Sequence, residues 1–203
     1  MAEQDRRGPW IVRSTRRVYD NPWIAVTEHD VVRPDGSPGL YGVCHMKGIA
    51  VGVVPIAEDG STWLVGQHRF PSDRYSWELP EGGGDPALPP LDSAIRELRE
   101  ETGLTARGWL EFLRLDFSNA VTDEAGFGFL AWDLAAGAAE PDEGEVLDVR
   151  RLPFQRALDM AMAGEIRDAF TQIMLLKVDA LGRRGALPEP VARALGYRLE
   201  PAS

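Results

Sequence analysis

The first part of the chain carries short runs in which apolar and polar residues roughly alternate. These runs are rich in β-branched and aromatic residues, which is typical of strands with one buried face. They cover residues 10–20, 23–33 and 40–46. Asn21-Pro22 separates the first two runs, and Asp35-Gly36 in the turn PDGSPG is a hairpin signal. The pattern therefore predicts an antiparallel strand region.

The hydrophobic pattern then changes to a continuous apolar run, IAVGVVPI, at residues 49–56. Such a run predicts a buried central strand. EDGS at residues 58–61 reads as another hairpin turn, followed by strands over 61–70 and 75–80. Glycine and proline dominate residues 80–90, where we expect a loop.

A helical period follows this loop and predicts a helix over residues 91–102. Its expected apolar stripe consists of Leu91, Ala94, Ile95, Leu98 and Thr102. Gly103 comes immediately after the stripe, where a helix favours a left-handed glycine cap. The sequence thus defines one central helix with a clear end.

The remaining pattern predicts three strands, an acidic loop and two helices. The strands cover residues 110–116, 126–134 and 147–153, the loop 137–146, and the helices 154–165 and 168–182. Asp168 is a plausible N-cap of the second helix. Together the elements indicate a mixed α+β fold, with strands before the central helix and two helices near the end.

Composition narrows the class of protein. The chain has 203 residues, of which 44% are hydrophobic and 27% charged, as in ordinary globular proteins. A net charge of −10 argues against binding to a nucleic-acid backbone. We expect no membrane span and no secretory signal, because no apolar run is long enough and the N-terminus lacks an apolar core. The single cysteine, Cys44, fits a reducing compartment, so we expect a cytoplasmic protein.

Three glutamates crowd one side of the central helix. Residues three and four apart are neighbours on a helix, so Glu97 lies beside both Glu100 and Glu101. If their carboxylates converged to about 5 Å, repulsion would cost on the order of 3 kcal/mol at an effective dielectric near 20. Either the carboxylates splay into water or a cation lies between them. Carboxylate oxygens suit Mg²⁺ or Mn²⁺, and the preceding Gly82–Gly84 lets backbone approach a ligand closely.

These residues resemble the Nudix hydrolase signature. RELREETGL, from Arg96 to Leu104, fits the second half of the signature at every fixed position, and Gly82 fits its opening glycine. The chain departs from the pattern at Leu88, where the family has its first glutamate. In the family that glutamate lies at the helix entrance, away from the innermost metal ligands. Its absence affects a positioning or outer contact of the metal site and does not remove the inner carboxylates.

The resemblance extends over about residues 10–180. GQHRFPSDRYSWELPEGGG, residues 66–84, is similar to the ADP-ribose pyrophosphatase branch, and residues 164–177 resemble its C-terminal helix. The resemblance implies a Nudix fold in which mixed sheets pack with helices as an α/β/α sandwich. It also implies a homodimer built with the N-terminal strands. We expect three parts: a strand region at 1–46, a Nudix domain at 47–183 and a tail at 184–203.

The resemblance also assigns metal ligands and a base. The side chains of Glu97, Glu100 and Glu101 would bind the metal together with the backbone carbonyl of Glu81. The base that activates water would come from the acidic loop, as Glu143 or, failing it, Glu145. Other members of the family use the residue equivalent to Glu97 for this step, so the three alternatives stay open.

Further residues would support the site or contact substrate. Arg96 would hold the acidic face in place, and Arg69 would contact a phosphate. The other expected substrate contacts are Glu78, Gly82, Gly83 and Glu124. Ordinary structural roles remain open, as a surface ion pair for Arg69 and as a structural partner for Glu78. An acidic loop or helix face is often simply solvated.

The implied activity is Mg²⁺-dependent, with Mn²⁺ as an alternative ion. It is hydrolysis of the pyrophosphate bond of a nucleoside diphosphate linked to a sugar, with ADP-ribose or another nucleotide sugar as substrate. The products would be a nucleoside monophosphate and a sugar phosphate. Leu88 motivates one alternative, a sensor of the same fold that binds ADP-ribose-like ligands with little cleavage. Hydrolysis of oxidised nucleotides or dinucleoside polyphosphates belongs to the same chemistry.

Overall fold

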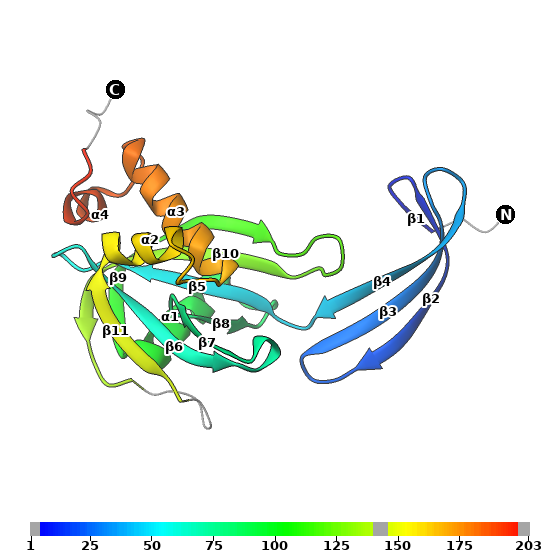
Figure 1. The fold of residues 1–203 in the computed structure, drawn as a ribbon, viewed down its shortest axis with the longest axis horizontal. Helices are drawn as coiled ribbons and strands as arrows, with labels where there is room; N and C mark the ends of the chain where they lie inside the picture. Colours follow the sequence, from blue (N-terminus) through cyan, green and yellow to red (C-terminus); the bar gives the residue numbers. More distant parts are fainter. Residues whose placement is uncertain (1–4, 140–145, 199–203) are drawn as a thin grey trace. The chain divides into compact units, whose positions relative to one another are not determined.

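The computed structural model describes residues 5–139 and 146–198. These residues form a mixed α+β fold with three sheets and four helices, which confirms the predicted fold class (Figure 1). The chain divides into two compact units. One combines the described residues up to Ile49 with Leu115–Ala125, and the other combines Ala50–Arg114 with the described residues from Gly126 onward.

The first unit contains an antiparallel sheet with the strand order β1-β2-β3-β4. Its strands are β1 (Arg6–Arg7), β2 (Trp10–Asp20), β3 (Ile24–Val32) and β4 (Pro38–Met46). The two expected turns both connect paired strands, so the predicted strand region is confirmed. Gly36 has φ +86°, a left-handed conformation that glycine adopts without strain.

A chain of hydrogen bonds crosses one face of this sheet. His45 Nδ1 lies 2.5 Å from the Asp123 carboxylate, and His45 Nε2 lies 2.8 Å from the Thr27 hydroxyl. The same hydroxyl lies 2.9 Å from His29 Nε2, and His29 Nδ1 lies 2.8 Å from the Thr15 hydroxyl. Each ring nitrogen of the two histidines therefore has a hydrogen-bond partner. The buried His29 side chain is fully hydrogen-bonded within the sheet.

The second unit contains two sheets, with strand orders β8-β5-β10-β9 and β11-β6-β7. The first comprises β5 (Ile49–Pro55), β8 (Glu81–Gly84), β9 (Leu104–Asp116) and β10 (Ala125–Ala136). The second comprises β6 (Ser61–Arg69), β7 (Arg74–Glu78) and β11 (Asp148–Pro153), with a 3₁₀ turn at Phe70–Ser72. Strand β5 is central and pairs in parallel with β10, which explains its continuous apolar run.

The helices of this unit are α1 (Pro90–Thr102), α2 (Phe154–Met162), α3 (Ala169–Arg183) and α4 (Glu189–Ala194). Helix α1 packs against β8 and β6, and α2 packs against α3, β11 and β6 (Figure 1). Helix α3 packs closely against β5 at Gly52. A Cβ at this position would lie 2.5 Å from Met174 and 2.9 Å from Phe170, so the contact requires glycine. None of the helices in the described chain combines the length and apolar character needed to cross a bilayer.

Three expectations about strands are wrong. EDGS does form a turn, but the strands it joins belong to different sheets, so it is not a hairpin. The expected glycine loop contains β8, because Glu81–Gly84 extends the sheet beside β5. The strand expected at 110–116 begins at Leu104, directly after the helix cap. In each case the strand assignment depends on pairing with a strand that is distant in sequence, which local composition does not indicate.

The helix predictions need two corrections. Ile95 is exposed, and the buried face of α1 instead includes Glu97 and Glu101. The expected tail contains a further helix, α4. The predicted caps are confirmed: Gly103 has φ +70° and the Asp168 side chain accepts a hydrogen bond from Thr171 N–H.

Candidate active site

The candidate site is organised around the crossover from β7 to β8, where the chain passes from one sheet to the other. Three backbone groups along the crossover have partners on three different elements. Leu79 N–H donates to the Thr171 hydroxyl of α3 at 2.9 Å, and Pro80 C=O accepts from Val53 N–H of β5 at 2.8 Å. Glu81 N–H donates to the Glu101 carboxylate of α1 at 3.0 Å. Three elements thereby fix the path of residues 79–81.

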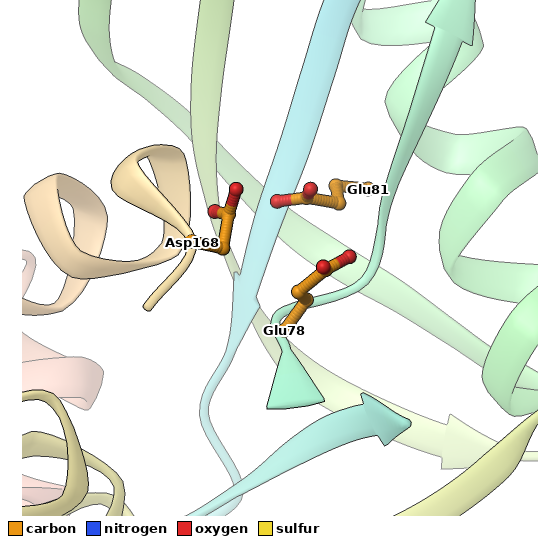
Figure 2. A group of neighbouring side chains, drawn as sticks. All are labelled: Glu78, Glu81 and Asp168. Atoms are coloured by element: carbon orange, nitrogen blue, oxygen red, sulfur yellow. The ribbon is translucent and has the colours of Figure 1, made fainter. Parts of the chain in front are cut away.

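Three carboxylates converge beside this crossover. Oxygens of Glu78, Glu81 and Asp168 all lie within 4.8 Å of one another. Figure 2 shows the three side chains directed toward a common region, Glu78 from the end of β7, Glu81 from β8 and Asp168 from the N-terminus of α3. Among residues 5–139 and 146–198, no other set of three or more acidic, histidine or cysteine side chains meets this criterion.

Arg69 is the cation that faces this group. Its Nε lies 3.1 and 3.0 Å from the two carboxylate oxygens of Glu78, and its terminal nitrogen also contacts Glu78 and lies 3.5 Å from Glu81. Burial opposes the charge of Arg69, but its hydrogen bonds to Glu78 and attraction to the carboxylates raise its pKa overall. The ion-pair role left open for Arg69 is therefore present in the structure, and the structure shows that its partner is Glu78.

Three ionised carboxylates would carry more negative charge than Arg69 neutralises, and burial disfavours that state in the absence of a further cation. Burial raises the pKa of Glu81 well above its ordinary value, and the nearby charges of Asp168 and Glu78 raise it further, while Arg69 opposes the effect. Burial also raises the pKa of Asp168, against hydrogen bonds from Thr171 that lower it. A set of hard oxygen donors with excess negative charge fits a divalent cation such as Mg²⁺. The residues present thus match the ion that the sequence predicts.

Helix α1 holds a second acidic group next to β8. Arg96 donates to Glu100 at 2.6 Å, to Glu97 at 2.7 Å and to the Gly83 carbonyl at 2.7 Å. This guanidinium offsets part of the repulsion between the neighbouring glutamates. Glu97 and Glu101 are buried, so these carboxylates do not splay into water.

Gly82 has a steric reason for being glycine. A Cβ at this position would lie 2.5 Å from both carboxylate oxygens of Glu97, far inside van der Waals contact. At Gly83 a Cβ would meet no atom within 4 Å, although its carbonyl anchors Arg96. A side chain at position 82 would therefore displace the Glu97 carboxylate.

The structure brings most of the predicted site residues into one unit. Glu81 connects the two acidic groups, since its side chain faces Asp168 and its N–H bonds Glu101. Glu124 belongs to the other unit, where burial raises its pKa. Glu143 and Glu145 lie outside the described residues. Their expected roles, and that of Glu124, stay predictions.

Sequence reasoning missed two residues of the site. Asp168 is predicted only as a helix cap, and Thr171 is not singled out, yet both contact the crossover or its carboxylates. The similarity of residues 164–177 to a family helix was the available signal. It marked the segment but not the direction in which its side chains point. Leu88, where the chain departs from the signature, has an exposed side chain, unlike the buried Glu97 and Glu101.

The α+β fold carries a cluster of carboxylates that is compatible with binding of a metal ion. The family is settled by comparison: the NUDIX domain matches residues 46–172, and the chain belongs to the Nudix family. Residues 10–44 match the nucleoside diphosphate sugar hydrolase N-terminal domain. The predicted family resemblance is thus confirmed, and the chain is a Nudix pyrophosphohydrolase.

Curated relatives align over most of the chain. It is 32% identical to the CMP-5'-(N-acetyl-N-hydroxy-3-aminopropyl)phosphonate hydrolase of Streptomyces rubellomurinus, over 89% of this chain and 86% of the relative. It is 33% identical to the ADP-ribose pyrophosphatase of Mycobacterium tuberculosis, over 88% of this chain and 87% of the relative. It is 30% identical to the ADP-ribose pyrophosphatase of Bacillus subtilis, over 76% and 84%. A solved ADP compounds hydrolase has the same fold, with a TM-score of 0.77, 23% identity and coverage of 87% of this chain and 96% of that chain.

Proposed function

We propose that this protein hydrolyses the pyrophosphate bond of a nucleoside diphosphate joined to a sugar, with ADP-ribose or another nucleotide sugar as substrate. The products are a nucleoside monophosphate and a sugar phosphate. The observation that carries the proposal is the convergence of carboxylates around Glu81, with Arg69 beside them, in a Nudix domain. The match of residues 10–44 to a nucleoside diphosphate sugar hydrolase domain supports the substrate class.

The acidic groups around β8 are the proposed holders of Mg²⁺, or of Mn²⁺. One set is Glu97, Glu100, Glu101 and the backbone carbonyl of Glu81. The carboxylates of Glu78, Glu81 and Asp168 form an adjoining donor set. When bound, a divalent ion supplies polarisation of a phosphoryl oxygen and stabilises developing negative charge.

Side chains of the protein complete the proposed reaction. Arg69 binds and orients a phosphate of the substrate through charge-assisted hydrogen bonds, with its guanidinium already fixed by Glu78. Glu143, or failing it Glu145 or Glu97, accepts the proton of the attacking water. Gly82 and Gly83 let the substrate approach the backbone of β8, and Glu124 contacts the distal ribose.

We further infer that the strand region at 1–46 forms a homodimer, next to a Nudix domain at 47–183 and a tail at 184–203. Exposed apolar side chains in the first unit support an interface. Trp23 is 73% exposed, Leu40 64% and Val121 55%. Sedimentation equilibrium of the whole chain tests the dimer, and a monomer at micromolar concentration contradicts it.

A substrate panel with Mg²⁺ and with Mn²⁺ tests the activity. It contains ADP-ribose, ADP-glucose, UDP-glucose and GDP-mannose, with products separated by ion-exchange chromatography. We expect cleavage of at least one member to a nucleoside monophosphate. Glu101→Gln removes a proposed ligand, whereas Asp92→Asn removes an exposed carboxylate from the same helix and serves as the matched control. Folded wild-type protein that turns over no member, or E101Q that retains full activity, contradicts the proposal.

A second candidate substrate is a CMP-linked phosphonate. Its support is the similarity to the Streptomyces rubellomurinus hydrolase over 89% of the chain. Adding a CMP-phosphonate conjugate to the panel separates the two candidates by the product formed. The sensor alternative predicts a third result, calorimetric binding of ADP-ribose in Mg²⁺ without product.

A further inference from the structure

Thr171 occupies an unusual place between helix α3 and the crossover from β7 to β8. Its side chain is fully buried, and its hydroxyl oxygen accepts the Leu79 N–H at 2.9 Å. Leu79 is also fully buried and lies between two strands of different sheets, so its N–H has no ladder partner there. The Thr171 hydroxyl therefore satisfies a backbone donor that would otherwise be orphaned in the interior.

The same hydroxyl also reaches the acidic cluster. It lies 3.4 Å from a carboxylate oxygen of Glu81, at the long end of hydrogen-bond distance, and Thr171 also hydrogen-bonds Asp168 of the same cluster. One oxygen atom thus joins the backbone of residue 79 to the side chain of residue 81. A hydroxyl has this combined capacity because it is both a donor and an acceptor.

Helix α3 holds Thr171 in place through its own cap. The Asp168 carboxylate accepts the Thr171 N–H at 2.6 Å and belongs to the cluster with Glu78 and Glu81. The first turn of α3 consequently fixes both one carboxylate of the cluster and the hydroxyl that anchors the crossover. The other crossover partners, Val53 and Glu101, hold residues 80 and 81 but not the Leu79 N–H.

We propose that Thr171 is a positioning residue of the active site, and that its hydroxyl sets the path of residues 79–81 and the orientation of Glu81. This inference rests on the proposed function, because Glu81 lies at the proposed cation site. Thr171 acts through the crossover and touches no reacting atom. Mutation of residues that hydrogen-bond to metal ligands and orient them commonly lowers metal affinity or activity by about 10- to 100-fold.

The test compares three variants of the whole chain. Thr171→Val removes the hydroxyl and keeps the shape of the side chain, while Thr171→Ser restores the hydroxyl. Thr62→Val is the matched control, because Thr62 is fully buried in β6 and its hydroxyl has no hydrogen-bond partner in the described chain. The readouts are amide exchange at Leu79 relative to amides of β10, Mn²⁺ titration followed by electron paramagnetic resonance, and kcat and KM on the best panel substrate.

We expect T171V to speed relative exchange at Leu79 by about tenfold or more, and to weaken Mn²⁺ binding by about tenfold or more. T171S and T62V should stay within about threefold of wild type in both measurements, given that they keep the crossover hydrogen bond. In kinetics, T171V should lower kcat more than it raises KM.

The inference is overturned if T171V matches T62V in amide exchange and Mn²⁺ affinity, or if T171S is as impaired as T171V. Should T171V fail to fold, T171S and Thr171→Ala carry the same comparison. A wild-type protein that binds Mn²⁺ but cleaves no panel substrate counts against the proposed function alone. In that case the exchange and titration results still decide the role of Thr171.

Discussion

Replacing Gly103 by alanine is expected to destabilise the second unit strongly, because two separate costs meet at this helix cap. Gly103 has φ +70°, and a left-handed conformation costs a residue with a Cβ about 1–2 kcal/mol. A Cβ would also lie 2.5 Å from Gly137 O, 2.7 Å from Ala139 N and 2.8 Å from Ala138 C. These are backbone atoms, which cannot rotate away as a side chain does.

The steric cost is the larger part of the expected effect. Gly137 N–H donates to Gly103 C=O at 2.8 Å, so moving the chain away from a new methyl group also strains this hydrogen bond. Overpacking of this kind costs about 1–3 kcal/mol. Alanine restricts the unfolded chain and returns about 0.4–1 kcal/mol. The net loss for G103A is therefore about 1–5 kcal/mol, with a central value near 3 kcal/mol.

Gly164→Ala is the matched control for this prediction. Gly164 follows helix α2 with φ +75°, but a Cβ there would meet no atom within 4 Å. The G164A variant carries the cost of the left-handed backbone without the steric collision. Its free energy of unfolding is therefore expected to fall by about 1 kcal/mol or less. Urea unfolding followed by far-ultraviolet circular dichroism measures both variants. Equal losses in G103A and G164A would refute the steric reasoning.

Further predictions concern the site, the histidine chain and the altered signature position. Gly82→Ala should lower activity at limiting Mg²⁺ by about tenfold or more in a rate assay, since its Cβ meets the Glu97 carboxylate; an unchanged rate would contradict this. Burial lowers the pKa of His29, so the unfolded chain binds the proton more readily than the folded one. The free energy of unfolding should therefore fall as the pH drops below about 6.5. Urea unfolding at pH 7.5 and 5.5 should show a smaller loss in His29→Gln than in wild type. An equal loss in wild type and His29→Gln speaks against a neutral buried His29. Leu88→Glu should change stability by less than about 0.5 kcal/mol and turnover by less than about threefold, because the position is exposed; a larger gain in turnover would place it among the functional carboxylates.

The local features of this protein follow from residues that are close together in the sequence. Residue alternation located strands β2 to β4, and the apolar run located β5 as a buried strand. Gly103 and Asp168 were identifiable as caps because cap chemistry depends only on neighbouring backbone. The motif from Arg96 to Leu104 identified the family from residues that are close in sequence.

The contacts between groups that are distant in sequence follow from tertiary packing. Glu81 and Thr171 are 90 positions apart, yet their contact joins α3 to the acidic crossover. No periodicity encodes such a pairing, because it depends on how sheets and helices stack after the elements form. The same reason explains β8: a glycine-rich segment reads locally as a loop, but a free sheet edge beside β5 supplies hydrogen-bond partners that make it a strand.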